Sequence, residues 1–349
     1  MDIFKNITHF NETVEQPVVG EAADLIFAGG CCLFFGIVGI VANVVGFAAV
    51  LSNRKLHTPC FLLISAHLVN ACLMAFGFLT DGAGFAAAGA KIVGTTRTRL
   101  VCFILGVTKT MTMAPSAVLT CMVGVDRLIS IAWPMHYKRV GRRCALYSLS
   151  FTILVAVANT VAAASTGPYM ADPIPCYNSF LALDIYFFIY YTCHNLFFCC
   201  VSVGVYAAIV IIVKARKAAN AFPLNQIQSG TSRPDSGKTV STLNHTEDVF
   251  LRQQLALLPM IGVMIIMYLA TGVVPEMAIS LSAFIDQGRY QPRVVVYASV
   301  LQSIGASADV FVLMAKCREF RNSLRRMSYK ILRKTMVEPV HVDENGGHN

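Results

Sequence analysis

The sequence predicts an all-α membrane protein, namely a seven-transmembrane helix bundle with a short amphipathic C-terminal helix. The first observation is composition, because 56% of the 349 residues are hydrophobic and only 13% are charged, whereas soluble domains carry roughly one-quarter charged residues. The second is that long apolar runs recur, each able to cross about 30 Å of hydrocarbon with roughly 20 helical residues. The third is that basic residues alternate between the two ends of these runs.

Seven apolar runs can be drawn, and they are spread along the chain as expected for one bundle domain. The outer end of the second run is the hardest to place, because the stretch from Asp81 to Ala90 is rich in Gly and Ala and has no clear apolar limit. The predicted limits are Leu25–Leu51, Cys60–Phe85, Leu100–Ala132, Ala145–Thr166, Leu181–Val213, Gln254–Phe284 and Val294–Ala315.

The basic residues orient the predicted bundle. With the N-terminus outside, six basic residues lie on the outer side, and twenty lie in the inner loops and tail. The positive-inside preference therefore predicts a multi-pass plasma membrane protein with an extracellular N-terminus. This distribution accounts for the net charge of +9, and no basic run is interleaved with aromatic residues as in a nucleic-acid surface. Membrane lipid, and not nucleic acid, is the expected partner of this charge.

The chain divides into an extracellular tail (1–24), the bundle (25–315), and an amphipathic helix with a cytosolic tail (316–349). The first part has no signal-peptide pattern, and its Asn-x-Thr triplets predict glycosylation at Asn6 and Asn11. The polar segment 215–252 has no periodic apolar face, so we expect a disordered third cytosolic loop. In Cys317–Lys334, apolar residues recur every three or four positions among basic ones, which is typical of a helix lying on anionic lipid.

Two cysteines fall on the oxidising outer side of this topology. Cys102 lies at the outer end of the third run, and Cys176 lies in the second outer loop. The other ten cysteines lie within runs or on the inner side, where we expect apolar packing. We therefore predict a disulfide between Cys102 and Cys176, which would tie this loop across the mouth of the bundle.

The third run ends on the inner side with Asp126-Arg127-Leu128, followed by Pro134 and a basic loop. A helix that runs from an outer Cys to an inner Asp-Arg resembles the third helix of rhodopsin-like (class A) G-protein-coupled receptors. Within these receptors, the segment from Asp126 to Pro134 is most similar to nematode serpentine chemoreceptors of the Srsx type. The resemblance covers nearly the whole chain and includes Asn43, Arg54–Pro59, Tyr206, Pro275 and Glu319–Arg321.

The resemblance implies a receptor that binds an extracellular ligand in the outer helical cavity and activates a heterotrimeric G protein. The expected ligand is chemosensory, a neuropeptide or another small molecule, and arrestin is a further candidate partner. Asp126, Arg127 and Tyr206 form the implied G-protein switch, in which Arg127 pairs with Asp126 at rest and reaches toward Tyr206 when active. No bond is made or broken, so we expect no enzyme and no organic cofactor.

Two departures from the family pattern fall in one buried polar cluster of Asn43, Asn70, Ser116 and Asp309. Asn70 stands where the family has Asp in the second helix, and Asp309 stands where it has Asn in the seventh. The exchange keeps one carboxylate, and an isolated ionised carboxylate in low dielectric is costly. We therefore expect a retained cation site with Na⁺ as the candidate ion, and an ion-free hydrogen-bonded cluster as the open alternative. No other metal is expected.

Ionisable residues within the apolar runs indicate the ligand cavity, because charge inside a membrane is costly and usually functional. The resemblance places Lys109, Met113 and Glu276 on this cavity. Lys109 and Glu276 could pair with each other, either for structure alone or to engage a charged ligand, and Lys109 argues against a biogenic amine. His67 and His194 have no metal-ligand spacing and are expected in the core.

Three other functions have weaker support in the sequence. An opsin needs a Lys in the seventh run, and Val294–Ala315 contains none. A transporter would show paired broken spans in two halves, and a metal-dependent membrane hydrolase would show two His on one helix face with an acidic partner. The alternatives that stay open are a seven-helix transporter and a membrane protein without a signalling role.

Overall fold

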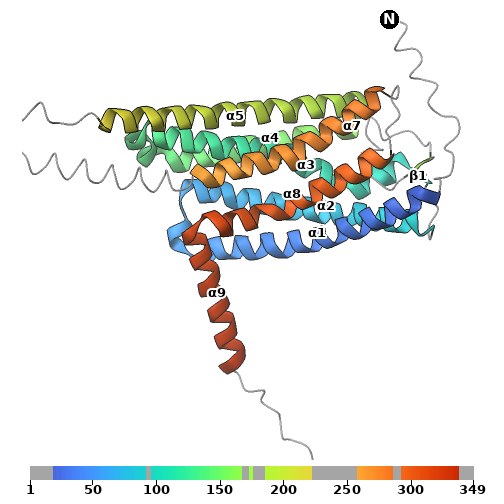
Figure 1. Cartoon of the computed structure of the whole chain (residues 1–349), viewed down its shortest axis with the longest axis horizontal. Coiled ribbons are helices and arrows are strands. Elements are labelled where there is room, and N and C mark those ends of the chain that lie inside the picture. Colours follow the sequence, from blue (N-terminus) through green and yellow to red (C-terminus); the bar gives the residue numbers. More distant parts are fainter. Residues whose placement is uncertain are drawn as a thin grey trace, which may run out of the picture.

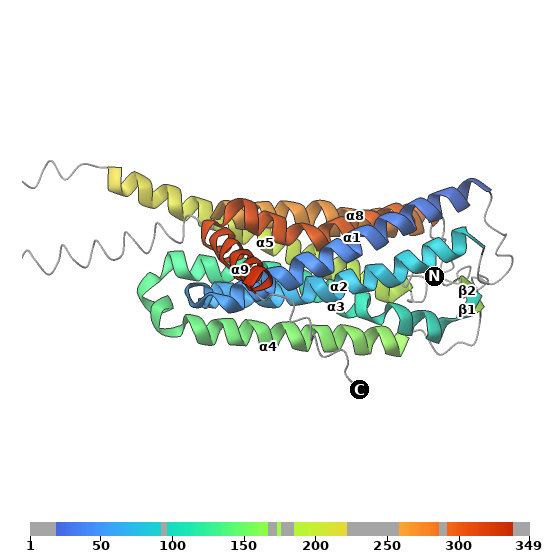
Figure 2. The same ribbon diagram turned by 90° about the horizontal axis from the view of Figure 1, so that it is seen from below.

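The computed structural model describes residues 19–91, 96–166, 173–175, 185–221, 258–285 and 292–337. Within these ranges, seven helices are long and apolar enough to cross a membrane, and an eighth, shorter helix follows them. The predicted fold class is therefore confirmed. Figure 1 shows the seven long helices running roughly side by side, with α9 leaving the end of the bundle at a steep angle. Figure 2 shows the same arrangement from a second direction.

The helices extend beyond several predicted limits. The second helix reaches Gly89, and the fourth begins at Pro134, so the predicted inner loop 135–138 is helical. The fifth helix continues into the segment that was predicted to be a disordered loop. The described residues do not include the rest of that loop, nor Asn6, Asn11 and Cys176. The elements are α1 (Val19–Ser52), η2 (Arg54–Leu56), α2 (Pro59–Gly89), β1 (Thr96–Thr98), α3 (Arg99–Ala132), α4 (Pro134–Thr166), β2 (Pro173–Pro175), α5 (Ile185–Ala221), η5 (Leu269–Val273), α7 (Val274–Ile285), α8 (Pro292–Lys316) and α9 (Arg318–Val337).

The third helix is the centre of the bundle. In the most apolar stretch of α3, 78% of residues are buried, against 17% in the fourth and fifth spans. Those outer helices turn large apolar side chains outward, including Ile153, Phe197 and Ile211, each more than 60% exposed. Outward-facing apolar side chains are the surface that lipid requires. Polar groups carried by α3 therefore point into protein, where they need partners.

Small residues allow α1 and α2 to approach closely. A Cβ added at Gly29 would lie 2.7 Å from the backbone nitrogen of Ala86, and one added at Gly82 would lie 2.9 Å from the backbone nitrogen of Leu33. Membrane helices pack through such small residues because lipid provides no hydrophobic force between them. The neighbouring Gly30 has no atom within 4 Å of its added Cβ, so it faces away from this contact.

We therefore expect Gly29→Val to destabilise the bundle and Gly30→Val to leave it nearly unchanged. Overpacking costs about 1–3 kcal/mol, and at Gly29 the obstacle is backbone, which cannot rotate away. Thermal denaturation of the purified variants in detergent measures the difference. Equal melting temperatures for the two variants would contradict the close α1–α2 contact.

The sixth span (Leu258–Ser282) contains a π-helical turn, η5, immediately before Pro275. Proline has no backbone N–H and its ring displaces the carbonyl four residues earlier, so the helix cannot continue with regular bonds. The hydroxyl of Thr271 donates to the carbonyl of Met267 at 2.7 Å within the widened turn. The sixth span thus carries a built-in irregularity between its outer and inner halves.

At the outer end of the bundle, β1 and β2 form an antiparallel pair in which Thr98 lies opposite Pro173. The oxygen of Thr98 accepts from the backbone N–H of Val101 and caps the start of α3. Cys102, in the first turn of α3, is disulfide-bonded and buried. The short sheet ends at the residue before Cys176, so the strand pairing agrees with the predicted bridge, whose second cysteine is not described.

The inner helix α9 is tied to α1 by its apolar side. Phe320 is fully buried and packs in a core cluster with residues of α1, α2, α3 and α8. The hydroxyl of Ser323 donates to the carbonyl of Ala49 at 2.7 Å. The exposed side of α9 carries Arg318, Arg321, Arg325 and Arg326. One face therefore packs on protein while the other presents positive charge, as expected for a helix at an anionic leaflet.

Candidate functional site: the inner ionic cluster and the helical cavity

The inner end of α3 holds a closed cluster of charged groups. Arg127 donates to one oxygen of the adjacent Asp126 carboxylate, from Nη2 at 2.5 Å and from Nε at 3.1 Å. Both side chains are buried, with Arg127 2% exposed. Charged hydrogen bonds contribute about 1.5–3 kcal/mol, so this pair holds the guanidinium firmly. It is the contact that we expected for the resting state.

Tyr137 completes this cluster, and its role was missed in the sequence because it was placed in a loop. As part of the first turn of α4, its hydroxyl donates to the other Asp126 oxygen at 2.8 Å and accepts from Arg127 Nη2 at 3.0 Å. The tyrosine thereby bridges the acid and the base. We call Asp126, Arg127 and Tyr137 the inner ionic cluster. The sequence signal was Pro134, which favours the first position of a helix.

Tyr206, the third predicted switch residue, lies on α5 and packs against the sixth span. A Cβ added at Gly262 would lie 2.6 Å from the Tyr206 hydroxyl oxygen. The missing side chain of Gly262 therefore makes room for this tyrosine. Nearby, Arg216 of α5 donates to the carbonyl of Ala132 at the end of α3, at 3.2 Å. At the inner end of the bundle, α5 thus contacts both α3 and the sixth span. A movement of the sixth span would change these contacts.

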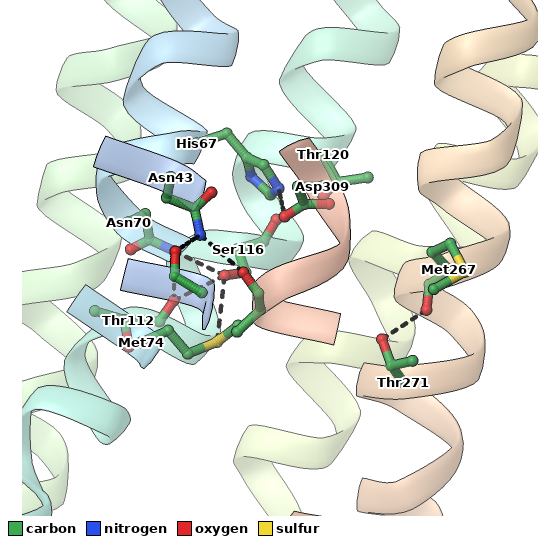
Figure 3. Close-up of polar contacts among 12 residues, drawn as sticks. Asn43, His67, Asn70, Met74, Thr112, Ser116, Thr120, Met267, Thr271 and Asp309 are labelled. Atoms are coloured by element: carbon green, nitrogen blue, oxygen red, sulfur yellow. Dashed lines mark hydrogen bonds and ion pairs between the residues drawn. The ribbon is translucent and has the colours of Figure 1, made fainter. Parts of the chain in front are cut away.

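Near the middle of the bundle, the four residues of the predicted polar cluster lie close together but do not all bind one another (Figure 3). The amide nitrogen of Asn70 donates to the Ser116 hydroxyl at 2.7 Å and to the carbonyl of Thr112 at 2.8 Å. Asn43 donates to the carbonyls of Gly39 and Ala306 at 2.8 and 2.9 Å. These bonds join α2 to α3 and α1 to α8.

Asp309 of the same cluster is instead paired with His67, which sequence reasoning placed in the core. The imidazole Nε2 of His67 lies 2.9 Å from the Asp309 carboxylate, and His67 is 5% exposed. Figure 3 shows the ring of α2 directed at the carboxylate of α8. The signal available in the sequence was spacing, because His67 and Asn70 are three residues apart and share one face of α2.

Lys109 does not pair with Glu276, contrary to one of our expectations. Its ammonium lies 2.6 Å from the carboxylate of Asp81, and both side chains are buried. Gly77 and Asp81 share a face of α2, and a Cβ at Gly77 would lie 2.9 Å from that of Lys109. The glycine lets α3 approach until the lysine reaches the acid one turn away. The ammonium also lies 4.8 Å from the centre of the Phe78 ring, where cation–π attraction adds to the pair.

Glu276 follows Pro275 at the start of α7 and faces α5. Its carboxylate accepts from the amide nitrogen of Asn195 at 2.8 Å and lies 3.5 Å from the Tyr191 hydroxyl. The side chain is buried, at 2% exposed. Its hydrogen-bond partners are therefore neutral, whereas Asp81, Asp126 and Asp309 each have a basic partner. Sequence reasoning identified Glu276 as a cavity residue but not this difference.

A narrow cavity extends between Glu276 and the His67–Asp309 pair. Its walls include Met113 and Glu276 at one end and His67 and Asp309 at the other, with Gln302 between them. The space open to the centre of a water molecule is 40 Å³, and one water needs roughly 10–15 Å³ on this measure. Both polar side-chain atoms of the buried Gln302 have no hydrogen-bond partner among the described residues. The cavity thus has a mainly apolar wall with a few polar groups, and it is large enough for a short chain of waters.

Comparison with known proteins identifies the architecture. The solved structure described as "Crystal structure of squid rhodopsin" superposes with a TM-score of 0.68 at 17% sequence identity, and the match covers 93% of this chain and 89% of that one. At this identity the match establishes a rhodopsin-like fold and no more. The family described as "Serpentine type 7TM GPCR chemoreceptor Srsx" matches residues 36–328, which include the inner ionic cluster, the cavity and most of α9. The chain therefore belongs to the Srsx family of serpentine seven-transmembrane G-protein-coupled chemoreceptors, which are receptors and not enzymes.

Proposed function

We propose that this receptor sits in the plasma membrane, binds a small extracellular chemical signal in its outer helical cavity, and activates a heterotrimeric G protein at its inner face. The observation that carries the proposal is the inner ionic cluster, in which Arg127 is held by Asp126 and Tyr137. A buried arginine held by an acid and a hydroxyl is a group that can be released. Its release toward Tyr206 would open the inner face to a partner.

The sixth span supplies a physical connection between the cavity and the inner face. The irregular turn η5 adjoins Glu276 on the outer side, and the wall of the cavity includes Tyr268 and Thr271 of the sixth span. A ligand that prefers one arrangement of this span shifts the balance between two conformations by its difference in affinity. In this mechanism, the inner half of the sixth span moves relative to Tyr206 and Gly262 and frees Arg127.

The pairing of the buried charges favours a ligand with a cationic or hydrogen-bond-donating group. Asp81 neutralises Lys109, so the lysine no longer argues against an amine. Glu276 offers a carboxylate whose partners, Asn195 and Tyr191, are neutral. A buried carboxylate gains most from a positively charged partner. Glu276 is therefore the ligand-recognising acid of the proposal, with Met113 forming part of the apolar wall.

The outer surface and its modifications complete the proposal. We propose that the N-terminus is extracellular and glycosylated at Asn6 and Asn11, and that Cys102 bonds to Cys176. The strand pair β1–β2, which ends directly before Cys176, supports the bridge. Arrestin is proposed as a second inner partner, because it would use the same face as the G protein.

The functional test is a reporter cell line that expresses the full chain together with a promiscuous G protein. The cells are exposed to pools of small amines, neutral odorants and small carboxylic acids, and calcium release is recorded. We expect responses among the amines. Responses to acids alone would contradict the assignment of Glu276, whereas G-protein activation by any pool supports the receptor function.

Glu276→Gln tests the proposed ligand acid directly. The amide keeps the size of the side chain but removes its charge, and a charged hydrogen bond is worth about 1.5–3 kcal/mol. We therefore expect the half-maximal concentration of an active amine to rise by roughly tenfold or more, since 1.4 kcal/mol is a factor of ten. Ser280→Ala is the matched control, because it removes the 2.9 Å contact with Thr192 between the same two helices. Equal shifts for both variants would assign Glu276 a structural role only.

A further inference from the structure

The Asp309 carboxylate is the one acid of the predicted cation site, and its surroundings bear on whether a metal ion fits there. An ionised carboxylate inside the membrane needs a positive or hydrogen-bonding partner. Hard cations such as Na⁺ would be held by several oxygen atoms converging on one point, as oxygen-ligated ions are in proteins generally. The question is therefore which atoms face Asp309 and which oxygens remain available.

The first observation is that a ring nitrogen already occupies a position beside the carboxylate. His67 Nε2 lies 2.9 Å from Asp309 Oδ2, which is ordinary hydrogen-bond distance. Because an ionised carboxylate only accepts, the nitrogen in this contact carries the proton. An N–H directed at the oxygen takes a position that a metal ion would need and gives the carboxylate a hydrogen bond in place of that ion.

The second observation is that, among the described residues, His67 alone bonds to the Asp309 carboxylate, while the nearby hydroxyls make their hydrogen bonds to other groups. The Ser116 hydroxyl accepts from Asn70 at 2.7 Å and donates to the Thr112 carbonyl at 3.0 Å. The Thr120 hydroxyl donates to the carbonyl of Ser116 at 2.9 Å. Figure 3 shows this network beside the His67–Asp309 pair, with no dashed line joining the two. Among the described residues, no group of three or more His, Cys, Asp or Glu side chains could hold a metal.

We propose that His67 takes the place of a metal counter-ion at Asp309, so that sodium does not bind in the interior of this receptor. The imidazole is fixed to α2 and bridges directly to α8. The link between these helices is therefore part of the protein itself and does not depend on the salt outside the cell. This replaces our sequence-based expectation of a retained cation site.

The proposal makes His67 the residue that closes a site which would otherwise be suited to sodium. Removing the ring leaves the Asp309 carboxylate on a cavity that is also lined by Ser116, Thr120 and Gln302. Gln302 has an unpartnered side-chain oxygen among the described residues. A carboxylate, hydroxyls, an amide oxygen and water are the ligands that hard cations take. His67→Ala is therefore expected to create sodium binding that the natural protein lacks.

The experiment compares thermal unfolding of the purified full-length protein in detergent with NaCl and with choline chloride at equal ionic strength. For the natural sequence we expect the same melting temperature in both salts. For His67→Ala we expect sodium to raise it by roughly 2 °C or more, since binding to the folded state alone stabilises that state. The additional change Asp309→Asn should abolish the sodium response of His67→Ala.

His194→Ala is the matched control, because it removes a histidine of another span that contacts its neighbour Asn195 and, in the described part of the chain, no acidic residue. This variant should stay insensitive to sodium. His67→Ser, whose side chain is too short to reach the Asp309 carboxylate, replaces the alanine variant if that variant does not fold. A sodium-dependent melting temperature in the natural sequence would overturn the proposal, as would the lack of any sodium response in both His67 variants. The test uses neither a ligand nor a G protein, so its outcome is independent of the proposed signalling function.

Discussion

Asp126→Asn is expected to raise signalling in the absence of ligand. The carboxylate accepts three hydrogen bonds within the inner ionic cluster, two from Arg127 and one from Tyr137. An asparagine has a single side-chain oxygen and no charge, so the guanidinium loses its charged partner. At about 1.5–3 kcal/mol for a charged hydrogen bond, the active-to-resting ratio should rise by roughly tenfold or more.

The measurement is basal activation of a promiscuous G protein in cells, corrected for the amount of receptor at the surface. Tyr137→Phe should produce a smaller rise, because it removes only the bridging hydroxyl and leaves the Asp126–Arg127 pair intact. Arg127→Ala should abolish both basal and ligand-induced signalling, because the group that is to be released is gone. An unchanged basal signal in Asp126→Asn, or an undiminished response in Arg127→Ala, would contradict the switch.

The apolar runs predicted the number and order of the spans because crossing the membrane fixes both helix length and composition. Helix ends were less predictable. Asp81 marked the uncertain outer end of the second span, but Lys109 neutralises its charge, and the helix continues to Gly89. The partner of a buried charge determines whether the residue can lie inside a membrane helix. That partner is about 28 residues away in sequence, beyond the reach of local patterns.

The site was predictable where the signal was chemical and unpredictable where it depended on contacts. Asp126, Arg127 and Asp309 were identified from the family resemblance, and Glu276 was identified because a charged residue in a membrane helix is costly and usually functional. His67 and Tyr137 were missed because each is a common residue in a bundle core, and only the approach of α8 or the early start of α4 gives it a charged partner. Residue types therefore located the costly charges, while the folded arrangement determined how each charge is neutralised.

Lys109→Met is expected to destabilise the protein strongly, because it leaves the Asp81 carboxylate buried without its base. Breaking a buried ion pair by removing one partner costs about 3–5 kcal/mol, and methionine retains most of the lysine stem. Thermal unfolding in detergent and the amount of protein at the cell surface measure the loss. The pair lies between α2 and α3, the central helix of the bundle, so its failure affects the whole domain.

The double variant Lys109→Met/Asp81→Asn distinguishes a structural pair from a ligand-binding lysine. If the pair is structural, removing the second charge restores most of the stability lost in the single variant, because an uncharged pair of similar shape carries no desolvation penalty for ions. The double variant should then respond to an active ligand with a nearly unchanged half-maximal concentration. A double variant no more stable than Lys109→Met would mean that the two charges do not depend on each other. A stable double variant that no longer responds to ligand would return Lys109 to the binding site, where sequence reasoning first placed it.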